Sequence, residues 1–408
     1  MSDHTPAYTP TRVSAATRGT YAAFIASGFA FASWASRIPQ VRDRLHLSPA
    51  DLGLVLLAIA AGSLVALPLA GIIVHRISSR RTVAGMSILM AAGLAVVATG
   101  YLAGVAPLLV GLFLFGFANG AWDVAMNVQG ASVERHLGRA IMPRFHAGWS
   151  AGTVAGALIG ALMVAVGVPV TAHLLVVAVV VGILVPTAVR DFVADTDEAD
   201  SASAATADAG SKGALVRWRE PRTLLIGVVV LAFAFSEGSG NDWINVALID
   251  GYAASDVVGT LGFATFLAAM TAVRWFGTGL LDRYGRVTVL RGLAAVAIVG
   301  LMLFGFSPFT PLAFLGALLW GAGASLGFPV GMSAAADEPA AAAARVSVVA
   351  SIGYCAFLGG PPLIGLLGEH ITVLRALVTV AVLLALATVV TNALRPLPAG
   401  SPAADPSR

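Results

Sequence analysis

Several acidic and amide side chains lie inside long apolar stretches of this sequence, where a charged group needs a specific reason to be. Glu237, Asn241 and Asp242 belong to the segment FSEGSGNDWIN (235–245), which follows RTLLIGVVVLAFA and precedes VALI. An ionisable group at the depth of a lipid bilayer costs roughly 2.5–3.5 kcal/mol or more and is usually functional. The chemistry expected of such carboxyls is proton uptake and release, or hydrogen bonding to a polar ligand.

A second polar stripe lies in GFANGAWDVAMNVQGASVE (116–134). Asn119, Asp123 and Asn127 are four residues apart, so a helix presents them on one face. In lipid this face must line a cavity or contact another helix. A polar contact between helices would contribute only about 0.6 kcal/mol per hydrogen bond. A neutral asparagine would make such a contact as well as Asp123 does. The presence of an acid therefore favours the interpretation that this face lines a cavity.

Two basic side chains follow in MPRFHAGWSAG (142–152). Arg144 and His146 could approach Asp123, and a carboxylate beside a cation keeps its charge, whereas the same acid alone in lipid takes up a proton. We therefore expect an acid–base pair that can exchange protons. The alternative for Arg144 is that it reaches the headgroups and binds lipid phosphate.

Glu237 lies about fifteen residues into its apolar segment, close to the bilayer centre at about 1.5 Å per residue. Asn241 shares its helical face. Gly238 and Gly240 are predicted to unwind the helix, so that its carbonyl groups also become ligands. In the alternative interpretation, Glu237 stays protonated and hydrogen-bonds across helices, or pairs with Arg274. The proton-coupling candidates are Asp123, Glu237, His146 and Arg144.

The composition requires a membrane around these residues. Of the 408 residues, 58% are hydrophobic and 11% are charged, against about 25% charged in soluble domains. The single cysteine allows no internal disulfide, and we expect no metal site and no cofactor. The formal charge of +3 comes from scattered arginines, which excludes nucleic acid as a partner.

Spans of about 20 apolar residues divide the chain into about twelve segments in two sets of six. We expect an N-terminal cytoplasmic tail (1–19), a six-helix bundle (20–190), a cytoplasmic linker (191–221), a second six-helix bundle (222–395) and a C-terminal tail (396–408). The polar start lacks the apolar region of a cleaved signal peptide. Arginine placement favours both termini in the cytoplasm. The cluster RIPQVRDRLHL (37–47), in the first outer loop, is the exception.

The two halves resemble each other. HAGWSAGTVAGALIG (146–160) matches SIGYCAFLGGPPLIG (351–365), and repeated halves around a central site are typical of secondary transporters. The glycines of the first stretch recur every four residues, which predicts close helix contact and a surface on which the halves could slide. Aromatic rings at matching places could stack on a ligand, although some fit an interfacial belt equally well. The binding candidates are Asn119, Asn127, Trp149, Asn241, Asp242, Trp243, Tyr354 and Trp34.

A loop motif completes the pattern. Two loops match G-x-x-x-D-R-x-G-R-[KR] in part, one after the second span and a better copy after the eighth. In the first copy His75 replaces the acid and Ser78 the glycine. With this motif the chain resembles the major facilitator superfamily over essentially its whole length. FASWASRIP (31–39), WDVAMNVQG (122–130), PRFHAGWSAG (143–152) and EGSGNDW (237–243) resemble its MosC-like branch of bacterial inner-membrane proteins. The gating-loop candidates are Gly71, His75, Arg76, Arg80, Asp282, Arg283, Gly285 and Arg286.

The resemblance implies an all-α integral membrane protein with about twelve transmembrane helices in two pseudo-symmetric bundles. It implies a monomeric secondary active transporter in the bacterial cytoplasmic membrane. Its substrate would be a small polar organic solute, such as a sugar, an amino sugar or a related metabolite, moved with protons by alternating access. The loop would act as a charge latch, weakened in the copy with His75. No nucleotide loop or hydrolase motif is present, so we expect no enzyme. The alternatives are a drug or natural-product exporter, an uncoupled facilitator or, remotely, a receptor or scaffold.

Overall fold

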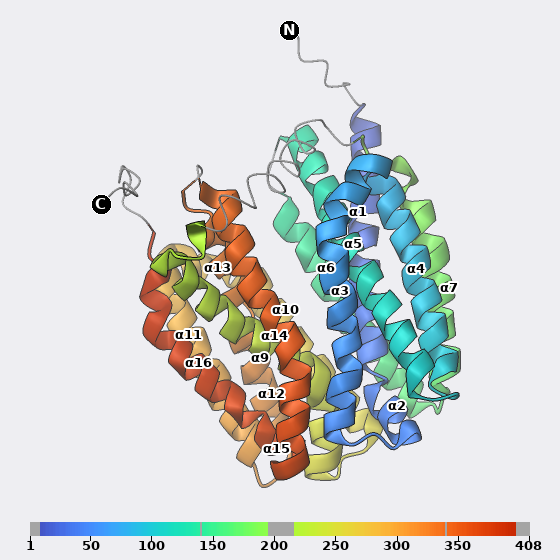
Figure 1. Cartoon of the computed structure of the whole chain (residues 1–408), viewed down its shortest axis with the longest axis vertical. Coiled ribbons are helices and arrows are strands. Elements are labelled where there is room, and N and C mark those ends of the chain that lie inside the picture. Colours follow the sequence, from blue (N-terminus) through green and yellow to red (C-terminus); the bar gives the residue numbers. More distant parts are fainter. Residues whose placement is uncertain (1–8, 139–140, 195–215, 339–340, 397–408) are drawn as a thin grey trace.

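The computed structural model describes residues 9–138, 141–194, 216–338 and 341–396, and these residues form helices and short connections without any strand. The predicted linker (191–221) and the predicted C-terminal tail (396–408) lie largely outside the described residues, whereas residues 10–19 of the predicted N-terminal tail belong to the first helix. The predicted fold class, two bundles of membrane-spanning helices, is confirmed (Figure 1).

The helices of the N-terminal half follow one another with short turns. They are α1 (Pro10–Ala35), the short α2 (Ile38–Leu45), α3 (Pro49–Ile77), α4 (Ser79–Gly100), α5 (Val105–Leu137), α6 (Met142–Ala165), α7 (Val170–Ala188) and η1 (Val189–Asp191). Helix α1 begins ten residues before the span predicted from Thr20. Helix α2 forms within the stretch that the sequence indicated as an outer loop.

The C-terminal half repeats this order. It contains α9 (Pro221–Tyr252), α10 (Asp256–Phe276), α11 (Thr278–Phe306), α12 (Thr310–Ala324), α13 (Gly327–Ala335), α14 (Ala342–Ile371), α15 (Val373–Ala376), α16 (Val378–Val390) and η3 (Thr391–Leu394). Eleven helical stretches among the described residues are long and apolar enough to cross a membrane. Helix α1 is more polar and packs against α5, α6 and α7. Together with α1, the described residues contain the predicted twelve membrane-spanning helices.

Packing partners reveal the pseudo-symmetry of the halves. Within the halves, α6 packs on α1 as α14 packs on α9, and α4 packs on α5 as α11 packs on α12. Between the halves, α6 meets α10 and α14 meets α3. The halves therefore touch through two equivalent helix pairs, which is the arrangement that the matched sequences predicted.

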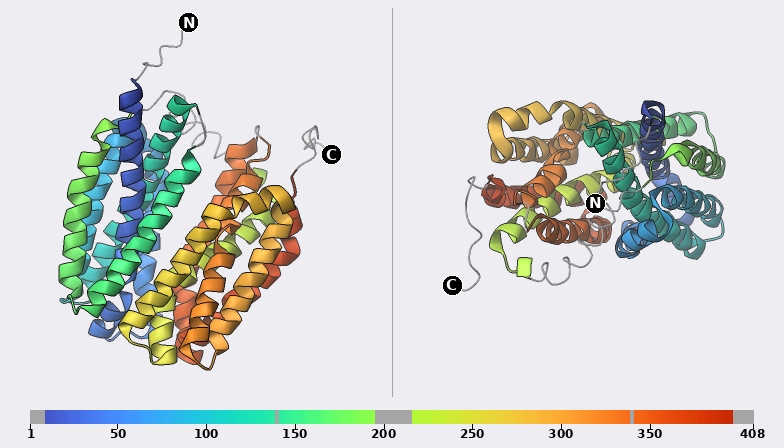
Figure 2. Two further views of the ribbon diagram at one scale, coloured as in Figure 1. Left: turned by 180° about the vertical axis from the view of Figure 1, so that it is seen from behind. Right: turned by 90° about the horizontal axis from the view of Figure 1, so that it is seen from above.

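The two halves converge at one end of the molecule and diverge toward the other (Figures 1 and 2). We call the end where α1 begins and η3 ends the terminal end, and the opposite end the closed end. At the closed end backbones of the two halves touch: a side chain added at Gly53 of α3 would collide with the Pro361 carbonyl of α14, and one at Gly365 with the Pro49 carbonyl.

Two predictions about glycines are corrected. Helix α9 is continuous through Gly238 and Gly240 and is not unwound. These glycines instead leave room for aromatic rings, because an added Cβ would lie 3.2 Å from Phe357 at Gly238 and would overlap Phe266 at Gly240.

The glycine stripe of α6 does contact another helix, but that helix is α1 of the same half. Added Cβ atoms would meet the Ile25 carbonyl at Gly152 and the Phe29 carbonyl, at 2.6 Å, at Gly156. The stripe is therefore not a sliding surface between the halves. Where α6 faces the other half it presents alanine, valine and leucine to α10.

Candidate functional site

The polar stripe of α5 forms as a connected row on one helical face. The Nδ2 of Asn127 donates to the Asp123 carbonyl at 2.8 Å and to its Oδ1 at 3.3 Å. One turn away, the Ser27 hydroxyl of α1 donates to Asn119 Oδ1 at 3.4 Å. All three stripe residues are half-buried. Among the described residues Asp123 has no ion-pair partner, so its charge is not compensated by a neighbouring cation.

Glu237 of α9 pairs with Arg274 of α10, as the alternative interpretation of the sequence had it. The Nη2 of Arg274 lies 2.7 Å from Glu237 Oε2, and both side chains are mostly buried. The Nε of Arg274 donates to the Ser325 carbonyl, at 3.0 Å, in the break between α12 and α13. Arg274 is therefore held from two sides, and Glu237 carries a fixed counter-charge.

Two pairs of polar groups on opposite halves lie near enough to interact electrostatically, without a described hydrogen bond or ion pair between them. Asp123 of α5 lies within electrostatic reach of Tyr354 on α14. His146 of α6 lies within electrostatic reach of Arg274 and packs edge-on against Phe24, with the ring centroids 5.2 Å apart. No described ion pair joins Asp123 to Arg144 or His146, so the expected acid–base pair does not form in this conformation.

The next turns of α9 carry polar groups without partners. Asp242 is half-buried, and no hydrogen bond or ion pair of its carboxylate occurs among the described residues. The Oδ1 atom of Asn241 is buried without a donor. The amide of Asn245 donates across the halves to the Ser36 carbonyl and within its own half to Thr260, both at 3.4 Å. A buried polar group without a partner costs about 1–3 kcal/mol, so this stretch of α9 is suited to a ligand or to water.

The aromatic candidates separate into two kinds. Trp34 and Trp243 are fully buried, and their indole N–H groups have no acceptor among the described residues. Trp149 and Tyr354 are half-buried. Trp149 lies beside Phe31 with the ring centroids 6.5 Å apart, and Tyr354 lies between Phe328 and Phe357. Of the four rings, only those of Trp149 and Tyr354 keep accessible surface.

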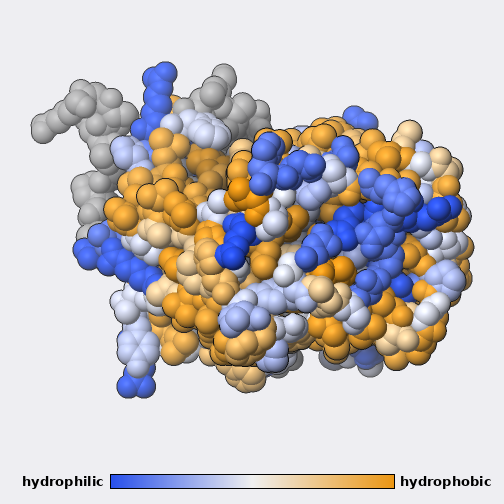
Figure 3. All heavy atoms as spheres, turned by 90° about the horizontal axis from the view of Figure 1, so that it is seen from below, coloured by the Kyte–Doolittle hydropathy of each residue, from blue (hydrophilic) through white to orange (hydrophobic). Residues whose placement is uncertain are grey.

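The closed end is held by a set of polar contacts that the sequence did not indicate. Arg42 of α2 makes a two-pronged ion pair with Asp250 of α9 and also contacts Asp43. Burial alone lowers the pKa of Arg42, but the hydrogen bonds to Asp250 hold that pKa above its ordinary value. Gln40 donates to Asp256 at 2.7 Å. We call Arg42, Asp250, Gln40 and Asp256 the closed-end clasp; hydrophilic residues cross this face between hydrophobic ones (Figure 3).

This clasp explains the arginine-rich cluster that broke the charge bias of the outer loops. Arg42 neutralises an acid of the other half. Arg37 is buried, donates to His173 Nδ1 at 2.9 Å and to the Val168 carbonyl at 3.1 Å, and so fixes the start of α7. Both side chains are structural partners rather than free positive charges.

The two copies of the loop motif share one backbone conformation. Ser78 has φ 80° and ψ 156°, and Gly285, at the matching position, has φ 75° and ψ 160°. This region is essentially reserved for glycine, so the serine of the degraded copy is strained. Arg286 pairs with Asp337 at 2.6 Å, and Asp337 also binds Arg222 at 2.8 Å.

The remaining loop candidates point outward at the terminal end. His75, Arg76, Arg80, Asp282 and Arg283 are exposed, and an added Cβ at Gly71 would meet no atom within 4 Å. No described ion pair joins Arg76, Arg80, Asp282 or Arg283 to the opposite half. No group of three or more side chains suited to a metal ion occurs among the described residues.

Beside these loops, Glu220 precedes α9 and binds Arg345 of α14 through both oxygens. Partial burial alone raises the pKa of Glu220, but the hydrogen bonds from Arg345 and Thr223 hold that pKa below its ordinary value. This carboxylate therefore stays charged and ties the starts of two helices together.

Two pseudo-symmetric helix bundles with polar groups facing across their junction define a multi-pass membrane transporter. The Major Facilitator Superfamily model matches residues 20–357, and the chain belongs to that family.

Relatives in bacteria agree with this assignment. The chain is 33% identical over 381 residues to the uncharacterized transporter y4wD of Sinorhizobium fredii, covering 93% of this chain and 98% of the relative. It is 29% identical over 376 residues to membrane protein MosC of Rhizobium meliloti, covering 90% and 88% respectively. The predicted resemblance to that branch is confirmed. The crystal structure of the nucleoside transporter NupG matches with a TM-score of 0.73 at 16% identity, covering 92% of this chain and 97% of NupG.

Proposed function

We propose that this protein is a secondary active transporter that moves a small polar organic solute across the bacterial cytoplasmic membrane by alternating access, coupled to protons. The solute class is a sugar, an amino sugar or a related hydroxylated metabolite. With both termini in the cytoplasm, the terminal end faces the cytoplasm, and the clasp closes the outer side. The protein acts as a monomer, with the solute, protons and membrane lipids as its partners.

One observation carries the proposal. Asp123 of one half and Asp242 of the other are acids within spanning helices, and neither has a cation partner among the described residues. A carboxyl without a counter-charge in an apolar setting exchanges a proton when water reaches it. Since Glu237 is paired with Arg274, we assign proton coupling first to Asp123 and Asp242.

The solute class follows from the groups at the junction. Asn119, Asn127 and Asn241 offer amide donors and acceptors that match hydroxyl groups. Trp149 and Tyr354 offer ring faces that can stack on a sugar or another flat solute. A nucleoside, as in the printed name of NupG, combines a sugar with a flat ring and belongs in the set to be tested.

The test is uptake into proteoliposomes. A panel of sugars, aminocyclitols, nucleosides and antibiotics is first screened for thermal stabilisation of the purified protein. Uptake of the stabilising compounds is then measured with and without an imposed pH gradient. The proposal expects gradient-driven accumulation that Asp123→Asn or Asp242→Asn abolishes, while Asp51→Asn, a carboxyl at a helix start, leaves it intact. Equal flux without a gradient, unaltered in both variants, would establish an uncoupled facilitator.

A further inference from the structure

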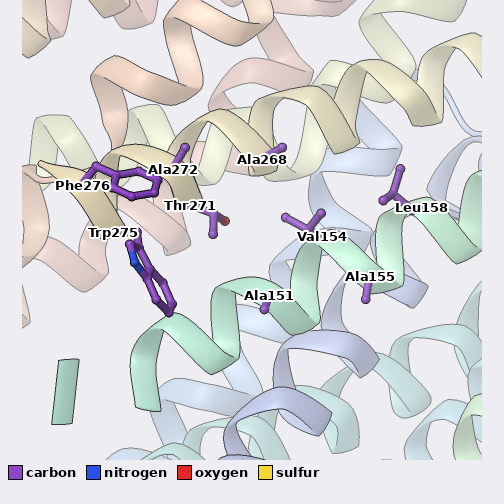
Figure 4. Close-up of a pocket in the computed structure, with 9 residues that line it drawn as sticks. All are labelled: Ala151, Val154, Ala155, Leu158, Ala268, Thr271, Ala272, Trp275 and Phe276. Carbon is purple, nitrogen blue, oxygen red and sulfur yellow. The ribbon is translucent and has the colours of Figure 1, made fainter. Parts of the chain in front are cut away.

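A groove of about 470 Å³ lies on the flank of the bundle where the two halves meet (Figure 4). One wall is α6 of the N-terminal half, and the other is α10 of the C-terminal half. Its lining is almost wholly apolar and consists of Ala151, Val154, Ala155, Leu158, Ala268, Thr271, Ala272, Trp275 and Phe276.

Small side chains create the groove. Ala151 and Ala155 are four residues apart on α6, and Ala268 and Ala272 are four apart on α10, so each helix turns a strip of methyl groups toward the other. The hydroxyl of Thr271 donates to the Leu267 carbonyl of its own helix at 2.7 Å. The indole N–H of Trp275 is then the one side-chain donor in the lining without a described partner, whereas a water molecule needs two to four polar partners.

The groove opens to the surroundings of the bundle. Leu158, Trp275 and Phe276 are exposed, with 49%, 56% and 78% of their surfaces accessible. Both helices belong to the stretches that are long and apolar enough to span a membrane. At this depth the medium that meets an apolar groove is hydrocarbon, so the occupant that fits is an acyl chain.

A cationic side chain continues the same face of α6 toward the terminal end. Arg144, Ala151 and Leu158 are spaced by seven residues, which places them on one side of the helix. Arg144 lies about 10 Å along the axis from Ala151, at about 1.5 Å per residue. Its side chain is exposed and has no ion pair or hydrogen bond among the described residues. A guanidinium in this position suits the phosphate of a lipid headgroup.

We propose that a phospholipid of the leaflet at the terminal end binds here, with one acyl chain along the α6–α10 groove and its phosphate at Arg144. This gives Arg144 a lipid partner instead of a part in proton coupling. Because the walls belong to different halves, the groove changes shape when the halves move. A lipid that binds this conformation more tightly than others favours it by mass action. The proposal depends on neither the solute nor the coupling ion.

Photocrosslinking in proteoliposomes tests the site. The probe is phosphatidylglycerol with a diazirine in one acyl chain, and adducts are mapped by peptide mass spectrometry. The proposal expects several-fold more adducts on the groove residues than on Val176, Val179 and Ile183, which are exposed on α7. Equal labelling of the two surfaces would overturn it.

Variants test the acyl-chain contact and the headgroup contact separately. Ala155→Leu with Ala272→Leu fills the groove and is expected to reduce its adducts to the α7 level. Arg144→Gln is expected to do the same, whereas Arg81→Gln, an exposed arginine of α4 at the same end, is expected to leave labelling unchanged. A diacylglycerol with the same diazirine chain is expected to label the groove weakly. Undiminished labelling in Arg144→Gln, or strong labelling by diacylglycerol, would overturn the headgroup contact.

Discussion

The clasp at the closed end predicts how the molecule opens there. Asp250→Asn removes the only ion pair between described residues that joins the two halves, from Arg42 of α2 to α9. Hydrogen bonds to charged groups contribute about 1.5–3 kcal/mol. The Asp250 side chain is 42% exposed and Arg42 keeps Asp43 as a partner, so screening reduces the expected loss to about 1 kcal/mol. That loss shifts the equilibrium toward opening about fivefold.

The assay measures distance across the closed end. Cys355 is the only cysteine, so Cys355→Ser provides a background for spin labels at Arg44→Cys and Ile371→Cys, both exposed at that end. Pulsed electron–electron double resonance then reports the share of molecules in which the two spin labels are far apart. Asp250→Asn is expected to raise that share about fivefold from the equilibrium shift, and added salt is expected to narrow the difference by screening.

Asp43→Asn is the matched control. Asp43 binds the same arginine but lies in α2 itself, so its removal leaves the contact between the halves in place. The reasoning is refuted if Asp43→Asn opens the closed end as much as Asp250→Asn does, or if neither variant changes the distances.

Three further predictions concern stability. Ser78→Gly relieves backbone strain and is expected to stabilise the protein by about 1 kcal/mol, seen as a higher Tm in detergent; Gly285→Ser should lower it, and the reverse order would contradict the strain argument. Gly152→Leu is expected to destabilise by about 3 kcal/mol or more through overpacking against α1, whereas Gly71→Ala, which meets no neighbour, should leave Tm unchanged or raised. The pKa of Glu220 is lowered in the folded protein, so its stabilisation is complete above its ordinary value of 4.5 and is lost as pH falls through the folded value. The Tm difference between wild type and Glu220→Gln should therefore shrink in acid, and a constant difference would count against the ion pair.

The sequence predicted the architecture well because long apolar runs and repeated halves are local, additive signals. The spacing of Asn119, Asp123 and Asn127 also predicted a shared face, since helical periodicity fixes it. The sequence predicted the ends of the helices less well. Helix α1 begins at Pro10, where the composition is still polar. Helix α2 is too short and too charged to be predicted as a helix from its sequence.

Contacts between distant segments could not be predicted from spacing. Arg42 and Asp250 are 208 positions apart, and only the docking of the halves brings them together. The same holds for Glu237, whose partner Arg274 was one alternative among several. The glycines of α9 looked like unwinding signals, but Phe266 and Phe357 occupy the space they leave, which no pattern within α9 reveals.

The central claim is that Asp123 and Asp242 lie on a water path that opens alternately to each side of the membrane. The direct measurement is the reaction of Asp123→Cys and Asp242→Cys, each in the Cys355→Ser background, with a membrane-impermeant thiol reagent applied to one side at a time. We expect reaction from the terminal side when the clasp is intact, and increased reaction from the opposite side when Asp250→Asn is added. The account would be contradicted by cysteines that react from neither side, or by reaction from the opposite side that does not increase when Asp250→Asn is added.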